Sequence, residues 1–178
     1  VDDKMITDEL KLVLNQDKTI VLILRNSDEH SVMVHRKFII DMVDLGITAP
    51  VILNRSYNDI SNLDFQIKSS IDIGSLYIDG LGDGVWVDFG SEYGIVNQTV
   101  FGILQASRMR ISKTEYISCP SCGRTLFDLQ ETTSKIRQVT NHLKGVKIGI
   151  MGCIVNGPGE MADADYGYVG TGNGYISL

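Results

Sequence analysis

Clusters of basic residues and long apolar runs are both missing from this 178-residue sequence. No Lys/Arg run occurs, and 16 basic against 22 acidic residues give a formal net charge of −6. Because binding of a phosphate backbone needs clustered Lys and Arg, we predict no nucleic-acid partner. The longest apolar runs, such as residues 20–24, have the length of a strand, so we predict no membrane span either.

A signal-peptide pattern and an initiator Met are also absent. The chain starts at Val1 and stops at Leu178, inside a predicted strand over residues 175–178. We therefore expect a fragment of a longer protein, for which missing targeting signals carry little weight. The composition, with 43% apolar and 21% charged residues, is that of a globular chain long enough to bury a core.

Cysteine is scarce, and its distribution is uneven. The chain has three Cys, all between positions 119 and 153. An odd number in a chain without secretory features disfavours a disulfide framework. The concentration of all three in one short region indicates a local site.

The first 110 residues alternate buried strands with amphipathic helices. This alternation is typical of βαβ units, so we predict an α/β fold with a mainly parallel sheet, a partial and barrel-like βα repeat. The Gly-rich turn at residues 80–84 matches neither dinucleotide nor P-loop spacing, and we interpret it as a tight turn in which Asp83 accepts backbone hydrogen bonds. The predicted helices are 4–16, 31–45, 59–73 and 93–108, and the predicted strands are 19–24, 50–53, 75–79 and 85–88.

From about residue 111 the pattern changes, and we predict a second, smaller α/β domain over 111–178 after a first domain over 1–110. A helix is expected from Asp128 to Leu143, and a Gly/Pro/Asn loop over residues 156–160. The predicted strands of this domain are 114–118, 146–151, 167–170 and 175–178.

The three Cys fall at the ends of two of these strands. Cys119 and Cys122 share a Cys-Pro-Ser-Cys turn, and Cys153 ends the strand that follows a helical crossover. In a right-handed β-α-β unit the ends of adjacent parallel strands lie at the same edge of the sheet. Three thiolates would meet there, a set of ligands suited to an iron–sulfur cluster or to zinc.

The fourth ligand is less obvious. The three His, at positions 30, 35 and 142, lie outside the loops around the thiols. The glycine-rich loop after Cys153 carries Glu160, and its flexibility would let this carboxylate reach the metal. A carboxylate is a hard ligand for iron held in sulfide, so we expect it to be replaceable and to leave one iron open to substrate.

Simpler interpretations remain open at this point. A Cys-x-x-Cys pair is also typical of structural zinc or of a redox dithiol. Cys153 would be inert if it were only part of a core, and Glu160 would be only a solvated carboxylate. The alternative functions are therefore an electron carrier or a structural zinc module.

Two longer motifs resemble one known family. Residues 119–128, CPSCGRTLFD, and 149–167, GIMGCIVNGPGEMADADYG, are similar to the C-terminal cluster domain of the 4-hydroxy-3-methylbut-2-enyl diphosphate synthases. Residues 108–116, RMRISKTEY, and the turn at 80–84 resemble the long form of this family, found in plastids and some bacteria. The long form consists of a catalytic barrel, an inserted middle domain and the cluster domain.

The resemblance implies an iron–sulfur oxidoreductase of non-mevalonate isoprenoid (terpenoid) biosynthesis. Such an enzyme acts on a CH or CH₂ group and takes its electrons from ferredoxin or flavodoxin. It opens the ring of 2-C-methyl-D-erythritol 2,4-cyclodiphosphate reductively, with loss of water, to give hydroxymethylbutenyl diphosphate. The expected location is the bacterial cytoplasm, or the plastid in a plant.

The same resemblance implies the site residues. A [4Fe–4S] cluster is held by Cys119, Cys122, Cys153 and Glu160 in this family pattern, and Asn156 matches the asparagine near the substrate. Glu160 and Asn156 are thus the expected catalytic residues. Arg108 and Arg110 are candidates for contacts to the diphosphate, with surface solvation as the alternative.

The resemblance also implies what the fragment would lack. The family's catalytic barrel lies upstream and supplies most of the cations that hold the diphosphate, and its cluster domain continues past Leu178. We therefore expect the isolated fragment to be inactive and its cluster to be lost easily during purification, because exposed clusters lose iron in air.

Overall fold

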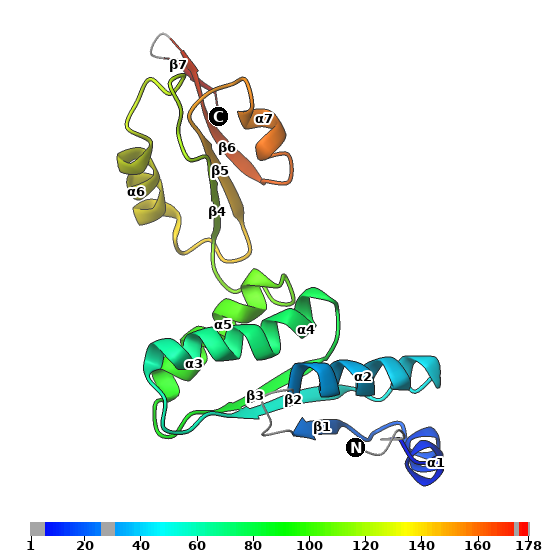
Figure 1. Ribbon diagram of the computed structural model, residues 1–178. Coiled ribbons are helices and arrows are strands. Elements are labelled where there is room, and N and C mark those ends of the chain that lie inside the picture. Colours follow the sequence, from blue (N-terminus) through cyan, green and yellow to red (C-terminus); the bar gives the residue numbers. More distant parts are fainter. Residues whose placement is uncertain (1–5, 26–30, 173–174, 178) are drawn as a thin grey trace. The chain divides into compact units, whose positions relative to one another are not determined.

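A computed structural model describes residues 6–25, 31–172 and 175–177 of the chain (Figure 1). The chain divides into two compact units, Val1–Arg110 and Ile111–Leu178, each with its own sheet. The chain therefore has an α/β fold with two small, mainly parallel sheets. Within the described residues, no helix combines the length and apolar character that crossing a bilayer requires.

The first unit contains a parallel three-stranded sheet in the order β1-β2-β3. The register pairs Leu24 with Leu53 and Asn54 with Trp86. Helices connect consecutive strands, as a parallel sheet requires. The elements are α1 (Asp8–Gln16), β1 (Leu22–Arg25), α2 (Ser31–Asp44), β2 (Val51–Ser56), α3 (Asn62–Ser69), a π-helical turn η1 (Ser70–Gly74), α4 (Ser75–Ile78), β3 (Gly84–Asp88) and α5 (Tyr93–Ala106).

Most of the predicted elements of this unit are confirmed, with shifted ends. Residues 4 and 5 of the predicted helix 4–16 lie outside the described residues, and the helix is observed from Asp8. The turn before β3 is also confirmed, because the Asp83 carboxylate accepts a hydrogen bond of 2.8 Å from the Val51 amide.

The prediction of a strand over residues 75–79 is wrong, because the helix continues there as α4 after the π turn. The buried side chains between Phe65 and Tyr77 recur at helical spacing, with Ser69, Ile73 and Leu76 between them. That spacing keeps one face of the helix in the core through the whole segment.

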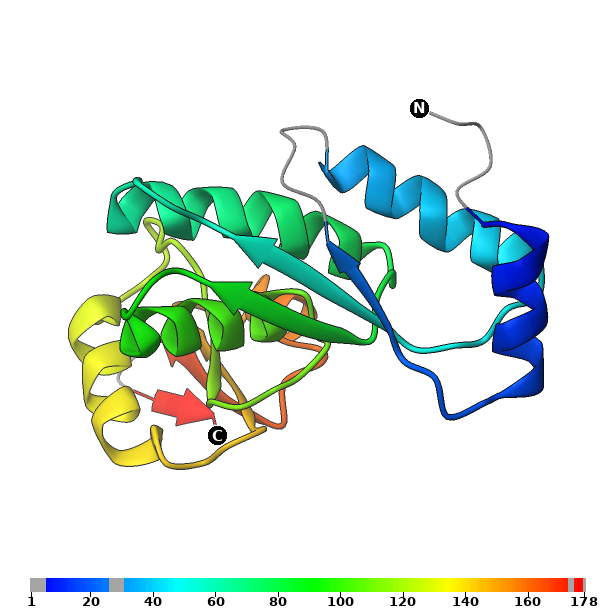
Figure 2. The same ribbon diagram turned by 90° about the horizontal axis from the view of Figure 1, so that it is seen from below.

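Helices α2 to α5 all lie on one face of the sheet (Figures 1 and 2). They bury an aliphatic core against β2, in which Leu53 and Ile73 are each only 1% exposed. The opposite face of the sheet is open in the described part of the unit, and Ile23 and Trp86 are 50% and 56% exposed there.

A buried ion pair joins β2 to the π turn. The Arg55 guanidinium donates to Asp72 Oδ2 from Nε at 3.0 Å and from Nη2 at 2.7 Å, and the Tyr57 hydroxyl donates to the same oxygen at 2.9 Å. His35 of α2 is 4% exposed, and burial lowers its pKa, as does the charge of Arg55, while Asp72 opposes both effects. The π turn therefore carries the carboxylate that balances a buried cation.

The second unit contains the sheet β4-β5-β6-β7, in which β4, β5 and β6 are parallel and β7 is antiparallel. Its core is small and centres on Leu129, Ile148 and Ile150. The elements are β4 (Glu115–Ser118), α6 (Leu129–Thr140), β5 (Lys147–Met151), α7 (Gly157–Glu160), β6 (Tyr166–Gly172) and β7 (Tyr175–Ser177).

The predicted strands and helix of this unit are confirmed with shifted ends, and one predicted loop is a helical turn. Asp128 caps α6 by accepting a hydrogen bond of 2.8 Å from the Glu131 amide, as its position predicts. Residues 157–160, predicted as loop, form the single helical turn α7 with Pro158 at its start, where the missing N–H of proline costs nothing. Residue 178 of the last predicted strand lies outside the described residues.

Candidate metal centre

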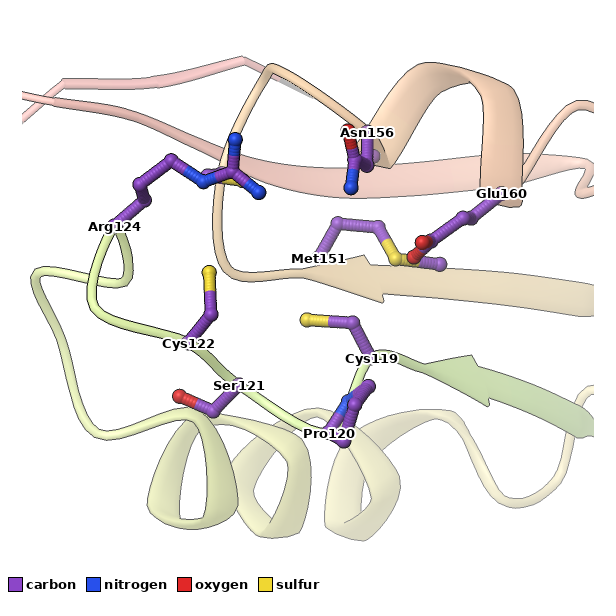
Figure 3. A pocket seen from close by; sticks show the side chains of 10 residues that line it. Cys119, Pro120, Ser121, Cys122, Arg124, Met151, Asn156 and Glu160 are labelled. Atoms are coloured by element: carbon purple, nitrogen blue, oxygen red, sulfur yellow. The ribbon is translucent and has the colours of Figure 1, made fainter.

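A pocket of about 110 Å³ opens at the edge of the second sheet where β4 and β5 end (Figure 3). A cavity of about 10–15 Å³ holds one water molecule, so this pocket has room for a group of several atoms. The residues that line it are Cys119, Pro120, Ser121, Cys122, Arg124, Met151, Cys153, Asn156, Gly157 and Glu160.

Cys119 extends the parallel pairing of β4 with β5. Its amide donates to the Ile150 carbonyl at 3.4 Å, and its Sγ accepts a hydrogen bond of 3.2 Å from the Gly152 amide. Gly152 fits closely against Thr125, because a Cβ at this position would lie 2.1 Å from Thr125 Oγ1. The sulfur of Cys119 is therefore held by the end of the neighbouring strand.

Cys122 lies in the exposed turn that follows. Ser121, between the two cysteines, has a φ of 71°, in the left-handed region that non-glycine residues rarely adopt. The turn is closed by a hydrogen bond of 2.9 Å from the Thr125 amide to the Cys122 carbonyl. This conformation brings both thiols to the same pocket (Figure 3).

Helix α7 supplies the opposite wall of the pocket. The Gly157 amide donates to the Cys153 carbonyl at 3.2 Å, and the Glu160 amide donates to the Asn156 carbonyl at 3.0 Å. Asn156 and Glu160 are four residues apart, so their side chains share one face of this turn. A Cβ at Gly157 would lie 2.9 Å from Met151 Cβ, so only glycine lets the turn approach β5 this closely.

The structure thus brings together five of the seven residues that the sequence singled out. Cys119, Cys122, Cys153, Asn156 and Glu160 all line the pocket, and the three cysteines are free thiols. Arg108 and Arg110 belong to the first unit, where the Arg110 guanidinium lies 5.2 Å from the centre of the Phe101 ring. His30 lies outside the described residues.

Arg124 is a pocket residue that the sequence interpretation missed. Hydrogen bonds from the backbone and side chain of Arg124 lower the pKa of Cys122, and the pKa of Arg124 is raised chiefly by Cys122, then by Cys153 and Glu160. Figure 3 shows its guanidinium above Cys122, on the same side of the pocket residues as Asn156. A basic residue two positions after the second cysteine was the available signal.

Three thiols and one carboxylate line the pocket, a donor set that thiolate-bound metals use. A structural zinc site places four ligands within about 2.3 Å of one atom. In the part of the chain that the structure describes, no three His, Cys, Asp or Glu side chains converge in this way. The donor set around this pocket is one that either zinc or an iron–sulfur cluster can use.

Comparison with known proteins gives the family. Residues 115–178 match the GcpE protein C-terminal domain. The chain is 52% identical over 174 residues to the 4-hydroxy-3-methylbut-2-en-1-yl diphosphate synthase (flavodoxin) of Parabacteroides distasonis, covering 97% of this chain and 28% of that protein. It is 53% identical over 135 residues to the chloroplastic synthase (ferredoxin) of Oryza sativa subsp. japonica, covering 75% of this chain and 18% of that protein.

The similarity to the bacterial synthase runs through both units, although the chain spans only about 28% of that relative's length. A second bacterial synthase, from Bacteroides thetaiotaomicron, is 51% identical over 174 residues, again 97% of this chain and 28% of that protein. The resemblance stated from the motifs is confirmed: the chain belongs to the 4-hydroxy-3-methylbut-2-en-1-yl diphosphate synthase family, whose C-terminal region it matches.

Proposed function

We propose that this chain forms the cluster-binding part of an enzyme that opens the ring of 2-C-methyl-D-erythritol 2,4-cyclodiphosphate reductively to 4-hydroxy-3-methylbut-2-enyl diphosphate. The observation that carries the proposal is the set of three thiols and one carboxylate around one pocket, in a chain about half identical to the named synthases. The reductant is ferredoxin or flavodoxin, the two donors that the relatives' names give.

The cysteines and Glu160 would hold a [4Fe–4S] cluster in this pocket. Such a cluster supplies single electrons and a Lewis-acidic iron for a substrate oxygen. Cys119 and Cys153 are half-buried at the ends of paired strands and are fixed by the sheet. Glu160 is exposed and is the last residue of the short helix α7. Its carboxylate can therefore leave the metal without disturbing the core.

Asn156 is placed to orient the substrate. Its side chain lines the pocket one helical turn before Glu160, and no hydrogen bond caps α7 through it. The amide is therefore available to donate to a substrate oxygen and to accept from a substrate hydroxyl. In this role Asn156 fixes which oxygen occupies the position that Glu160 leaves.

The rest of the enzyme would cover the pocket and hold the diphosphate. Ile154 and Val155, beside Cys153, are 52% and 63% exposed, and such an apolar rim is typical of a surface that a partner covers. The partner in this proposal is the enzyme's own upstream catalytic barrel, and Arg108 and Arg110 remain candidates for contacts to the diphosphate. The setting is the bacterial cytoplasm, or the plastid in plants.

The first unit would belong to a barrel-like middle domain. Parallel strands are normally covered on both faces, yet the face of this sheet that carries Ile23 and Trp86 is open among the described residues. Further βα units that close the sheet would bury that face, as the interior of a barrel does.

Anaerobic reconstitution of the 178-residue chain with iron and sulfide tests this proposal. We expect iron and sulfide, a brown chromophore, and a visible spectrum that changes when the cyclodiphosphate is added. Cys153→Ser should show reduced iron content, and Glu160→Gln should show an altered visible spectrum before the cyclodiphosphate is added. Glu131→Gln, on the exposed side of α6, is the matched control.

Two outcomes would count against the proposal. Zinc without a chromophore would support a structural module instead, and a stable cluster that never responds to the cyclodiphosphate would support an electron carrier. We also expect no turnover from this chain alone with a chemical reductant, because Arg124 is the one cation among the described residues that line the pocket. Measurable turnover would contradict that expectation.

A further inference from the structure

Groups that can carry negative charge outnumber positively charged groups around the pocket. Four acidic groups line it, the thiols of Cys119, Cys122 and Cys153 and the carboxylate of Glu160. All four are anionic when they bind a metal. Arg124 is the only cationic side chain among the described residues that line the pocket, so a group bound there gathers negative charge against one positive charge.

Arg124 is exposed, and its side chain lines the pocket together with this anionic set. Its side chain lines the same pocket as Cys122, Cys153 and Glu160, and Figure 3 shows its guanidinium above Cys122. These three groups raise the pKa of Arg124, Cys122 most strongly. The three groups come from two loops that are separated by helix α6 and β5. The position of one guanidinium therefore couples electrostatically to ligands on both sides of the pocket.

We propose that Arg124 sets the reduction potential of the cluster through the positive charge that it places among the residues lining the pocket. Each electron that enters adds one negative charge to a site that four anionic ligands already surround. A nearby cation, and hydrogen bonds to the sulfurs, stabilise the reduced state more than the oxidised state. Arg124 thus raises the reduction potential of the site, so that weaker electron donors can reduce it.

This inference rests on the proposed function, since it requires that the chain binds an iron–sulfur cluster. The size of the effect follows from Coulomb's law at an exposed position, where water weakens the interaction. We expect loss of the charge to reduce the equilibrium constant for one-electron reduction on the order of tenfold, equal to about 59 mV.

The test is a redox titration of the full reconstituted chain, followed by its visible spectrum, with iron and sulfide content measured first. Arg124→Gln should shift the midpoint potential about 59 mV lower. Arg124→Lys, which keeps the positive charge, should have a midpoint close to that of the wild type. The matched control is Arg137→Gln, which removes the same charge from α6, where the guanidinium lies 4.9 Å from the centre of the Tyr116 ring.

An unchanged midpoint in Arg124→Gln at wild-type cluster content would overturn the proposal, as would an equal shift in Arg137→Gln, which would show a general effect of net charge. If Arg124→Gln takes up no iron, an Arg124→Lys variant with a cluster and a near-wild-type midpoint supports the charge role. Failure of both variants to take up iron assigns Arg124 to loop structure and overturns it. A wild-type chain without a cluster contradicts the proposed function itself, and this inference with it.

Discussion

The two units differ in whether their ionisable side chains are buried and paired. The first unit buries Arg55 and balances it with Asp72, which also accepts a hydrogen bond from Tyr57. The second unit leaves its three thiols and Glu160 around an open pocket. Its core is also smaller, centred on three buried side chains, whereas the first unit packs several helices against its sheet.

The first unit balances its buried charge with its own side chains, whereas the second, under the proposed function, would be completed by what it binds. A buried ion pair is satisfied within the chain, whereas ligands arranged around a pocket gain their interactions only when the pocket is filled. The chain offers separate probes for the two units, because its one Trp, Trp86, lies in the first and all three Cys lie in the second.

The largest effect is expected from Asp72→Asn. This change removes the carboxylate from the buried Arg55, and breaking a buried pair on one side costs about 3–5 kcal/mol. Urea unfolding followed by Trp86 fluorescence should show the loss, while the reactivity of the thiols stays unchanged. The control is Asp41→Asn, which breaks the exposed pair with Lys37 and should cost less than about 1 kcal/mol. A small effect of Asp72→Asn would mean that the first unit does not depend on its buried pair.

Filling the pocket should stabilise the second unit alone. A ligand at a hundred times its dissociation constant adds about 2.7 kcal/mol to the state that binds it, and cluster binding should add at least this much. Amide hydrogen exchange, measured by mass spectrometry, should slow about a hundredfold in peptides from residues 111–178 and stay constant in those from 1–110. Cys153→Ser, treated identically, is the control, and equal slowing in both units would break the comparison.

An intermediate effect is expected from Gly170→Ala in β6. The added Cβ would lie 2.7 Å from the Gly152 carbonyl oxygen and 2.7 Å from Phe127, so the strand behind the pocket must shift. Overpacking of this kind costs about 1–3 kcal/mol. The protection of the thiols against a chromogenic reagent in urea should fall accordingly. Gly123→Ala, where no atom lies within 4 Å of the new Cβ, should leave it unchanged.

The smallest effect concerns pH. Burial first, and Arg55 second, lower the pKa of His35, so the folded first unit disfavours the protonated form. The unfolded chain, with an ordinary pKa of about 6.5, binds more protons below that pH, and stability falls there by up to about 1.4 kcal/mol per pH unit. Above pH about 6.5 the residue has no such effect.

His35→Gln should flatten this dependence in urea unfolding followed by Trp86 fluorescence between pH 7.5 and 5. His142→Gln, in the second unit, is the control and should leave the curve of the first unit unchanged. A wild-type curve without an acid-side decline would show that His35 tolerates its proton when buried.

Much of the fold was predictable because its signals are local. Short apolar runs of consecutive residues predicted β2 and β5. The start of α6 followed from Asp128, directly before the helix. The meeting of Cys119 with Cys153 followed from topology, since adjacent parallel strands end at one edge. Five pocket residues could therefore be named in advance.

The failures have a different physical origin. The helix over residues 75–78 follows a π turn in which Asp72 pairs with Arg55, seventeen residues earlier, and no local pattern shows that pair. Helix α7 forms because Gly157 fits against Met151, a contact between segments that the sequence alone does not bring together. Arg124 was missed although it lies two positions after Cys122, because only the structure shows its side chain among the residues that line the pocket.

The crossover between β4 and β5 also bears on how the molecule folds. Cys119 and Cys122 precede helix α6, whereas Cys153 and Glu160 follow β5, so the pocket cannot exist until this whole segment has formed. Pairing across such a separation is slow compared with local helix formation. During synthesis, the first two thiols therefore emerge before their partners and pass a period in which oxidants can join them to each other. Under the proposed function, iron would be most useful late, once the strand that precedes Cys153 has joined the sheet.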